Sequence, residues 1–285
     1  MKLAHRVSLD GVQLDSLDPR IIIRGIEGGA GRETVTVAAT GAGDGTRITG
    51  MRRESVELAV RIAMNISARR TSAFSAELID ISGGMIGSAE ANGMEERGRV
   101  LEEINAWAAR GGVLRISYKP NRRLNVDEVV LPGEGDLWRR LSEYTITFRA
   151  HAIPYWEENT ATVAETSTGQ NRSGSILIAG SAKTVLDAEL INQSGATINT
   201  ASITIGGKTM SFTSLGLGGG ETLKIDHVIT RGKNVVRIRI GSKSVLAKRS
   251  EDSADEFEAL PGDCAFSFTA QRACRLRVSC RGRFA

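Results

Sequence analysis

The chain has 285 residues, 41% of them hydrophobic and 25% charged, which is the composition of an ordinary folded protein with room for a sizeable core. No apolar run approaches the ~18 residues that cross a bilayer, so we expect no membrane insertion. Charge but no apolar stretch marks the first residues, so no secretory signal is visible and we expect synthesis in a cytoplasm. The net charge of +4 is too small to indicate a dense nucleic-acid-binding surface.

The N-terminal third predicts strands separated by glycine-rich turns. The turns are Gly28-Gly29 with Gly31, and the stretch from Gly41 to Gly45. Alternation is clearest in the last strand, where every second residue is apolar. The strand candidates are Arg20–Glu27, Glu33–Ala39, Thr46–Arg53 and Ser55–Met64.

A helix is predicted over Met94–Arg110, after a Gly- and Ser-rich loop from Ile81 to Asn92. Asn92 can cap the helix start, and Gly111-Gly112 can end it. The apolar residues recur every three to four positions, which is the spacing of a half-buried helix, and they are Val100, Leu101, Ile104, Trp107 and Ala108. Strands follow at 113–118, at 122–131 (stopped by Pro132-Gly133) and at 144–148.

Residues 158–172 are polar, small and without apolar periodicity, which predicts a linker. Domains are therefore expected at 1–157 and 173–285, and the second should fold alone. Short alternating strands with turn signals predict an antiparallel sandwich there. The strands expected are Ser175–Ala179, Ala188–Asn192, Ser202–Ile205, Thr209–Thr213, Thr222–His227, Asn234–Ile240, and a C-terminal pair (264–268 and 274–280) that turns near Gln271.

No residues converge on a catalytic, cofactor or metal site. The three histidines, His5, His151 and His227, lie far from any nucleophile motif. The three cysteines are odd in number and form no CxxC pair, so we expect buried free thiols without a zinc site. We expect no cofactor and no enzyme activity.

Four other features have a functional and a structural interpretation. Arginines at 275, 277, 281 and 283 would form a cationic patch or a solvated strand face. Gly216 to Gly220 lacks the Lys-Ser/Thr pair of a phosphate loop and is interpreted as a plain loop. The acidic run from Glu251 to Glu258 lacks the spacing of an EF-hand, so a solvated loop is favoured over calcium binding. Tyr155 and Trp156 are expected to pack at the domain junction, with a subunit contact as the alternative.

The order of motifs along the chain resembles the distal tail proteins of long-tailed bacteriophages. The N-terminal part of the resemblance is the helix region 95–110 with Gly111-Gly112-Val113-Leu114, and the closing Pro154-Tyr155-Trp156. Ile153 departs from the acidic residue that often precedes this triplet. The C-terminal part consists of Asn192-Gln193-Ser194-Gly195, Ile203-Thr204-Ile205-Gly206-Gly207, the segment 219–226 (GGETLKID) and Leu260-Pro261-Gly262-Asp263.

The resemblance implies a mainly β protein: an N-terminal β-rich belt domain with one amphipathic helix, and a C-terminal galectin-like antiparallel β-sandwich. It implies a structural protein of the virion tail tip, assembled in the host cytoplasm, with six copies in a ring. Implied partners are the tail tube protein, the tape-measure protein and the receptor-binding proteins, while DNA passes through the channel without specific binding.

The alternative is a carbohydrate-binding adhesin that uses the C-terminal sandwich. A glycan groove usually offers stacking aromatic rings, and residues 173–285 contain neither Trp nor Tyr. The residues therefore favour the tail protein.

Overall fold

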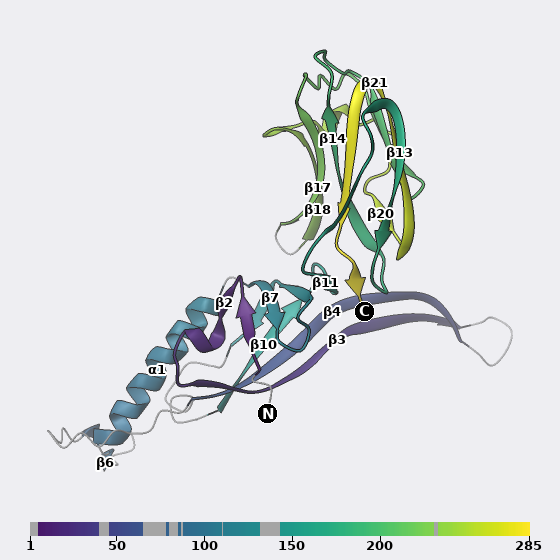
Figure 1. Cartoon of the computed structure of the whole chain (residues 1–285). Coiled ribbons are helices and arrows are strands. Elements are labelled where there is room, and N and C mark those ends of the chain that lie inside the picture. The colour runs from purple at the N-terminus through teal and green to yellow at the C-terminus, as the bar shows by residue number, and fades with distance from the viewer. Residues whose placement is uncertain are drawn as a thin grey trace. The chain divides into compact units, whose positions relative to one another are not determined.

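The computed structural model describes residues 5–39, 46–64, 78–79, 85–86, 88–109, 111–131, 143–230 and 233–285. Contacts divide the chain into two compact units, Met1–Pro154 and Tyr155–Ala285, which are described separately. Over the described residues the chain is mainly β with one α-helix, as the sequence predicted (Figure 1).

The N-terminal unit contains two antiparallel arrays of strands and the helix. One array has the order β2-β1-β7-β8 and the other β3-β4-β10-β9, and β5 pairs with β6. A short 3-10 helix, η1 (Leu14–Ser16), follows β2. The strands are β1 (Val7–Leu9), β2 (Val12–Gln13), β3 (Ile21–Ala39), β4 (Thr46–Met64), β5 (Leu78–Ile79), β6 (Met85–Ile86), β7 (Gly112–Ile116), β8 (Arg122–Val126), β9 (Glu128–Val130) and β10 (Glu143–Ala150).

The four predicted strands of residues 20–64 are two long strands, so the predicted turn at Gly28-Gly29 is wrong. β3 pairs with β4 from Ile21 to Ala39, and the glycines lie at a register shift between Gly28 and Gly31. Both Gly28 and Gly29 have φ of +86°, and a Cβ on Gly28 would lie 2.6 Å from the Glu57 carbonyl oxygen. Glycine here therefore makes a β-bulge within a strand. The other predicted turn, 41–45, lies outside the described residues.

Helix α1 (Ser88–Ala108) begins earlier than predicted, so Asn92 lies within the helix and does not cap it. Val100, Ile104 and Ala108 are fully buried, which confirms the predicted inward face. Trp107 is half-buried: its ring meets Phe148 edge to face at 6.1 Å, and its Nε1 donates to the Val12 carbonyl. The start of the preceding predicted loop lies outside the described residues.

The strand predicted at 122–131 is interrupted at Asp127, between β8 and β9. The Asp127 carboxylate accepts hydrogen bonds from the backbone N–H groups of His151 and Ala152 at 2.7 to 3.1 Å. The chain therefore leaves one array at β8 and joins the other at β9, which pairs with β10. The charged residue Asp127, within an otherwise alternating run, was the sequence signal for this break.

The C-terminal unit is built on one ten-stranded antiparallel sheet, whose main path is β16-β15-β21-β14-β17-β18-β19. β12, β13 and β20 pair at its sides, β11 pairs with β22, and η2 (Leu246–Lys248) is a 3-10 helix. The strands are β11 (Trp156–Glu158), β12 (Thr162–Glu165), β13 (Gly169–Ile178), β14 (Thr184–Asn192), β15 (Ala201–Ile205), β16 (Lys208–Phe212), β17 (Thr222–Thr230), β18 (Lys233–Ile240), β19 (Lys243–Ser244), β20 (Glu258–Ala259), β21 (Gly262–Cys280) and β22 (Arg283–Phe284).

The predicted linker 158–172 is largely strand. β12 pairs with the second part of β21, and β13 pairs with its first part. The N–H of Thr166 also donates to the Leu276 carbonyl at 2.9 Å, so the short break between β12 and β13 stays on the sheet. The small polar residues of 158–172 are the exposed residues of edge strands, which need little apolar surface. They do not mark a flexible linker.

The predicted C-terminal hairpin is one continuous strand, so the turn expected near Gln271 is wrong. β21 runs unbroken from Gly262 to Cys280. Its even-numbered residues are buried from Cys264 to Ala270 and again from Cys274 to Cys280, so the inward phase never changes. Because β21 pairs with β13 and β15 in its first part and with β12 and β14 in its second, the two halves of the expected sandwich belong to one sheet.

One hydrophobic core fills the C-terminal unit. Phe212, Phe257, Phe266 and Phe268 are at most 2% exposed and belong to a single cluster. Both parts of β21 contribute inward residues to it, so the sheet closes around its own apolar face. Among the described residues, no helix is long and apolar enough to span a bilayer.

Candidate functional site

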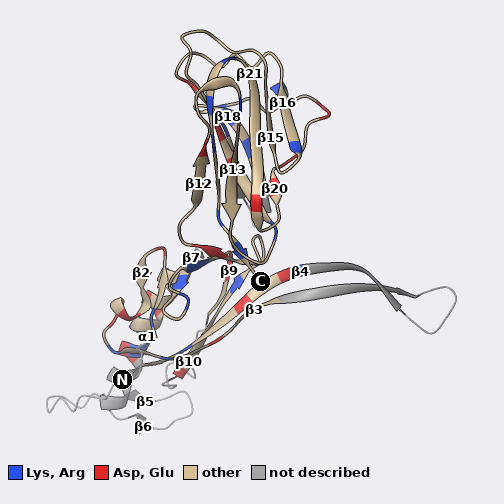
Figure 2. Cartoon of the chain, turned by 45° about the vertical axis from the view of Figure 1, so that its right-hand side comes forward, with Lys and Arg blue, Asp and Glu red and all other residues tan. Residues whose placement is uncertain are grey.

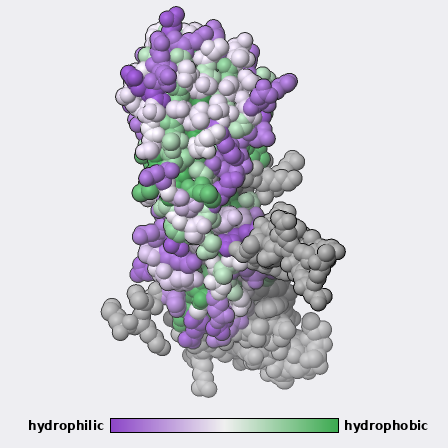
Figure 3. Space-filling view, turned by 90° about the vertical axis from the view of Figure 1, so that its right-hand side faces the viewer, coloured by the Kyte–Doolittle hydropathy of each residue, from purple (hydrophilic) through white to green (hydrophobic). Residues whose placement is uncertain are grey.

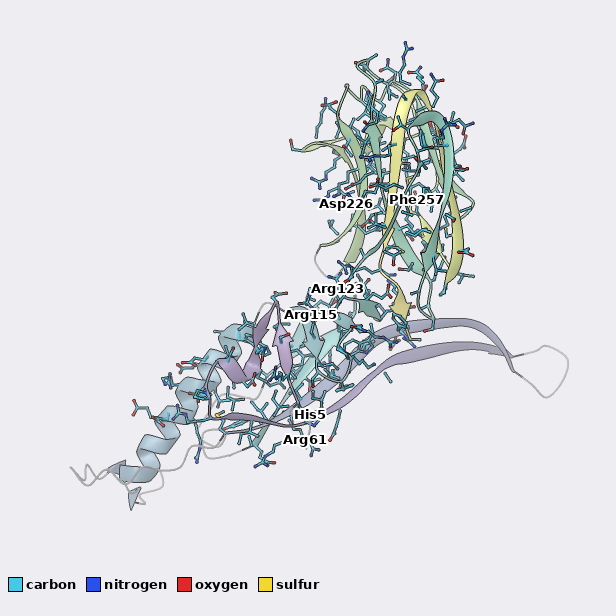
Figure 4. All side chains as sticks on the ribbon, viewed as in Figure 1. His5, Arg61, Arg115, Arg123, Asp226 and Phe257 are labelled. Carbon is cyan, nitrogen blue, oxygen red and sulfur yellow. The ribbon has the colours of Figure 1, made fainter. Side chains whose placement is uncertain are left out.

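The three histidines are held by acidic neighbours or lie at the surface. His5 is exposed (Figure 4), and His151 Nε2 lies 2.8 Å from a Glu128 carboxylate oxygen. The His227 side chain is only 6% exposed, and its Nδ1 lies 2.9 Å from Asp187. These are polar contacts between neighbouring strands and loops, and within the described part of the chain no hydroxyl or thiol is hydrogen-bonded to any of the three rings.

The three cysteines are free and buried, as predicted. Burial raises the pKa of the Cys274 and Cys280 thiols to about 11, and it also raises that of Cys264. Thiols with raised pKa values are poor nucleophiles and poor metal ligands. Within the residues that the structure describes, no group of three or more His, Cys, Asp or Glu side chains could hold a metal ion.

The acidic run 251–258 is tied to basic side chains. Glu258 contacts both Lys183 and Lys208, the latter at 3.0 Å. Burial opposes ionisation of Glu258, but the hydrogen bonds from the two lysines outweigh it and hold the pKa of this carboxyl at about 2. Asp255 lies 3.0 Å from Arg249. These carboxylates therefore fix a loop against the sheet.

Asn192 explains two of the motifs that carried the resemblance. It is fully buried, and its Nδ2 donates to the carbonyls of Leu217 and Gly218 at 3.0 Å. Its Oδ1 accepts from the N–H of Ser194 at 2.9 Å. The Asn192 side-chain amide thus joins the loop at 192–195 to the glycine loop at 216–220. Its role is to stabilise the fold.

The glycine loop is a structural turn, as predicted. The Gly218 N–H donates to the Glu221 carboxylate at 2.6 Å, so a carboxylate of the chain already uses the donor that a phosphate would need. Strand β17 follows, where a phosphate loop would need a helix N-terminus.

The C-terminal arginines each have an acidic or carbonyl partner. Arg275 and Arg277 lie 3.4 and 3.6 Å from the carboxylate of Glu165, and Arg283 lies 3.4 Å from Glu157. Arg281 donates to the carbonyls at 158 and 159. Since β21 has a strand on both sides, these arginines do not protect a free edge, and the cationic patch is neutralised.

Charged side chains on the outer surface of β14, β17 and β18 are also paired. Asp226 accepts two hydrogen bonds from the Arg237 guanidinium, at 2.6 and 3.0 Å (Figure 4). The hydrogen bond from Arg237, with the further charge of Arg239, holds the pKa of Asp226 below its usual range against the effect of burial. This surface stabilises the sheet and presents little uncompensated charge.

The two aromatic residues of the junction motif contact the last strand of the chain, β22. Trp156 is 1% exposed and pairs in register with Phe284. The Arg283 guanidinium lies 5.7 Å from the centre of the Tyr155 ring. Packing of these rings at the domain junction itself stays a prediction.

Two surfaces were missed by the sequence prediction. The first is the outer part of the β3–β4 hairpin: β10 pairs with β4 from Val56 to Ala63, whereas β3 continues on β4 as far as Thr46. We call the segments 33–39 and 46–53, the parts of β3 and β4 beyond β10, the hairpin arm (Figure 1). The second is a groove of about 410 Å³ on the C-terminal unit, at the ends of β15, β16 and the first part of β21.

No protein-family model matches the chain, and no curated protein sequence matches it. Solved structures do. The Dit protein of phage SPP1, described as a paradigm of the hub adsorption apparatus in phages that infect Gram-positive bacteria, superposes with a TM-score of 0.64 at 14% identity, over 99% of this chain and 100% of that chain. Two structures of the phage p2 baseplate in its activated conformation, with calcium and with strontium, give TM-scores of 0.44 and 0.42 at 8% identity, over 98% and 97% of each chain.

The likeness to the SPP1 protein spans both units and every motif on which the sequence resemblance rested. The chain therefore has the fold of a phage tail hub protein, the distal tail class that its sequence resembles.

Proposed function

We propose that the protein is a structural component of a phage tail, located at the tail tip as a hub between the tube and the host-recognition apparatus. Six copies form a ring through their N-terminal units, and the protein has no catalytic activity. The observation that carries the proposal is the whole-length likeness to a hub protein, with a TM-score of 0.64.

The hairpin arm supports self-association. Within the described residues, the strand segments 33–39 and 46–53 pair only with each other. A two-stranded ribbon is at best marginally stable in water, because it lacks a third strand or a packed face. A neighbouring copy would supply that cover, and a contact between different surfaces of successive copies closes into a ring.

The register of the arm favours a protein neighbour. Val35 is paired with Met51, and Val37 with Ile48, so apolar residues hold facing positions in the ribbon. Apolar pairs strengthen a ribbon when another surface covers them, and they favour aggregation when exposed. In the ring they lie at the contact between copies.

The partners follow from this position. The tail tube protein and the tape-measure protein meet the ring on its axis, and the receptor-binding proteins dock farther out. DNA passes through the channel without specific contacts. Assembly takes place in the host cytoplasm.

Shortening the arm tests the proposal. In the variant, an Asn-Gly turn replaces residues 34–52 and joins Glu33 to Arg53, which are paired in register, while the part of β4 that pairs with β10 stays intact. Analytical ultracentrifugation of the full chain, alone and with the tail tube protein of the same phage, should show an assembly near six copies, and only monomer for the variant.

A matched control changes an exposed apolar side chain in the other unit. Leu260 is 71% exposed, so Leu260→Asp alters surface hydrophobicity without touching the arm and should leave the assembly unchanged. If the shortened variant associates like the wild type, the arm is not the contact. If the wild type stays monomeric in both conditions, the ring proposal is refuted.

A further inference from the structure

One half of the C-terminal sheet presents small, uncharged, hydrogen-bonding side chains to solvent. β13, the first part of β21, β15 and β16 lie side by side, and their core-facing residues alternate with outward ones. The register aligns the outward residues in two rows across the four strands. The rows are Thr209–Thr204–Ser267–Ser173 and Ser211–Ser202–Thr269–Asn171, which we call the hydroxyl face.

The absence of charge from these rows is a local property. In the other half of the same sheet, one register row carries five charged residues in succession, with Lys224 at 3.0 Å from Glu189; the row is Glu165, Arg277, Glu189, Lys224 and Arg239. Charged residues make up 25% of the chain, yet the two rows of the hydroxyl face contain none. In Figure 2 strand β15 carries neither charge colour, and Figure 3 shows a largely pale surface on this unit, of intermediate hydropathy with hydrophilic margins.

The groove of about 410 Å³ extends the hydroxyl face at one end. Gln271 stands at this end with a fixed side chain, because its Oε1 accepts from the backbone N–H groups of Asn199 and Thr200 at 2.9 and 3.3 Å. These two hydrogen bonds involve only Oε1 and do not use the Gln271 side-chain nitrogen Nε2. Apolar and polar residues alternate in the lining, as in Ala201 beside Ser202 and Thr269 beside Ala270.

We infer that the hydroxyl face and its groove bind a neutral glycan chain. Each Ser or Thr hydroxyl both donates and accepts, and Asn171 and Gln271 add amide groups, so the face matches ligands that carry donors and acceptors together. Covering it displaces no charged group from water, which a charged surface would require at considerable cost. Neighbouring strands repeat the same groups about every 4.8 Å, which suits a ligand that is itself a repeating chain.

The face also explains why the sequence argued against sugar binding. Residues 173–285 contain neither Trp nor Tyr, so ring stacking contributes nothing, and the hydrogen-bonding rows become visible only when the register is known. The binding is therefore weak for one copy. It does not depend on ring formation.

Saturation-transfer NMR on the full chain tests the inference, with maltohexaose, cellohexaose and chitohexaose as neutral probes and a hyaluronan hexasaccharide as the charged one. Thr204→Glu places a charge within one of the two rows. Ser202→Ala with Thr269→Ala removes two hydroxyls from the other row while keeping the strand geometry. Thr222→Glu, on the charged half of the sheet, is the matched control. Thermal unfolding checks that every variant is folded.

We expect saturation transfer to at least one neutral probe and little to the charged probe. The affinity should be at least ~10-fold lower in both hydroxyl-face variants, since each lost hydrogen bond contributes about a fivefold factor and the double variant loses two, while the glutamate adds a charge that must lose its water. The control variant should bind as the wild type does. The inference is overturned if no neutral probe at millimolar concentration receives saturation, if binding survives in the folded variants, or if Thr204→Glu instead dissociates an assembly, which would make the face a protein interface.

Discussion

Replacing Asn192 by alanine should strongly destabilise the C-terminal unit. The side chain is fully buried, and the two hydrogens of its Nδ2 are shared among three carbonyl oxygens, those of Ala196, Leu217 and Gly218, at 2.8, 3.0 and 3.0 Å. Its Oδ1 accepts from the N–H and the hydroxyl of Ser194 at 2.9 and 2.7 Å. The substitution removes all of these bonds from two loops at once.

The expected loss of unfolding free energy depends on the hydrogen bonds that the three carbonyl oxygens keep after the substitution. Every one of the three carbonyls keeps a second donor, so none becomes an unpaired buried acceptor; these donors are Ser194 Oγ, the N–H of Ile198 and the N–H of Glu221. The loss is therefore about three net hydrogen bonds at ~1 kcal/mol each, so about 3 kcal/mol in the free energy of unfolding. For a unit of this size that lowers Tm by about 10 °C.

Differential scanning calorimetry of the full chain measures this shift. The matched control is Asn199→Ala, because Asn199 is exposed and its side chain should contribute no more than about 0.5 kcal/mol. A Tm for Asn192→Ala within 2 °C of the control would refute the reasoning, since the buried amide would then contribute no more than a surface residue.

Three further predictions follow from strand pairing and ionisation. A fragment of residues 155–285 should give dispersed NMR spectra, whereas 173–285, which lacks β12 and the start of β13, should not; equal dispersion in both would contradict the pairing of these strands with β21. Because the pKa of Glu258 is lowered to about 2, its stabilisation is present above its ordinary pKa of 4.5 and is lost as the pH falls through about 2, so the Tm of Lys208→Ala should fall less than that of the wild type between pH 5 and pH 2; parallel curves would argue against the ion pair. The three buried thiols should resist iodoacetamide at pH 8 in the native protein and react in urea, as mass spectrometry would report, and rapid native alkylation would show that the core is open.

The sequence predicted most of the strands and the inward face of the helix, because alternation and helical periodicity follow directly from burial. It failed where a residue type has two uses. Gly28-Gly29 indicated a turn but forms a bulge, since positive φ serves both. The polar residues of 158–172 indicated a linker but lie on β12 and β13, because an edge strand needs few apolar residues.

The continuous strand β21 could have been predicted from the sequence. Buried residues keep even numbers from Cys264 to Cys280, with exposed Arg272 as the one interruption, and a hairpin gives no reason for the phase to persist. The hydroxyl face could not have been predicted from the sequence. Thr204 and Ser267 are far apart in sequence, and only the register of β15 on β21 brings them together. The likeness to galectins in particular stays a prediction.

Electron microscopy of the full-length protein, alone and mixed with the tail tube protein of the same phage, tests the proposed assembly most directly. The account predicts rings of six copies around a central opening, with the N-terminal units in mutual contact. Monomeric particles in both samples, or assemblies in which the N-terminal units do not touch, would contradict it.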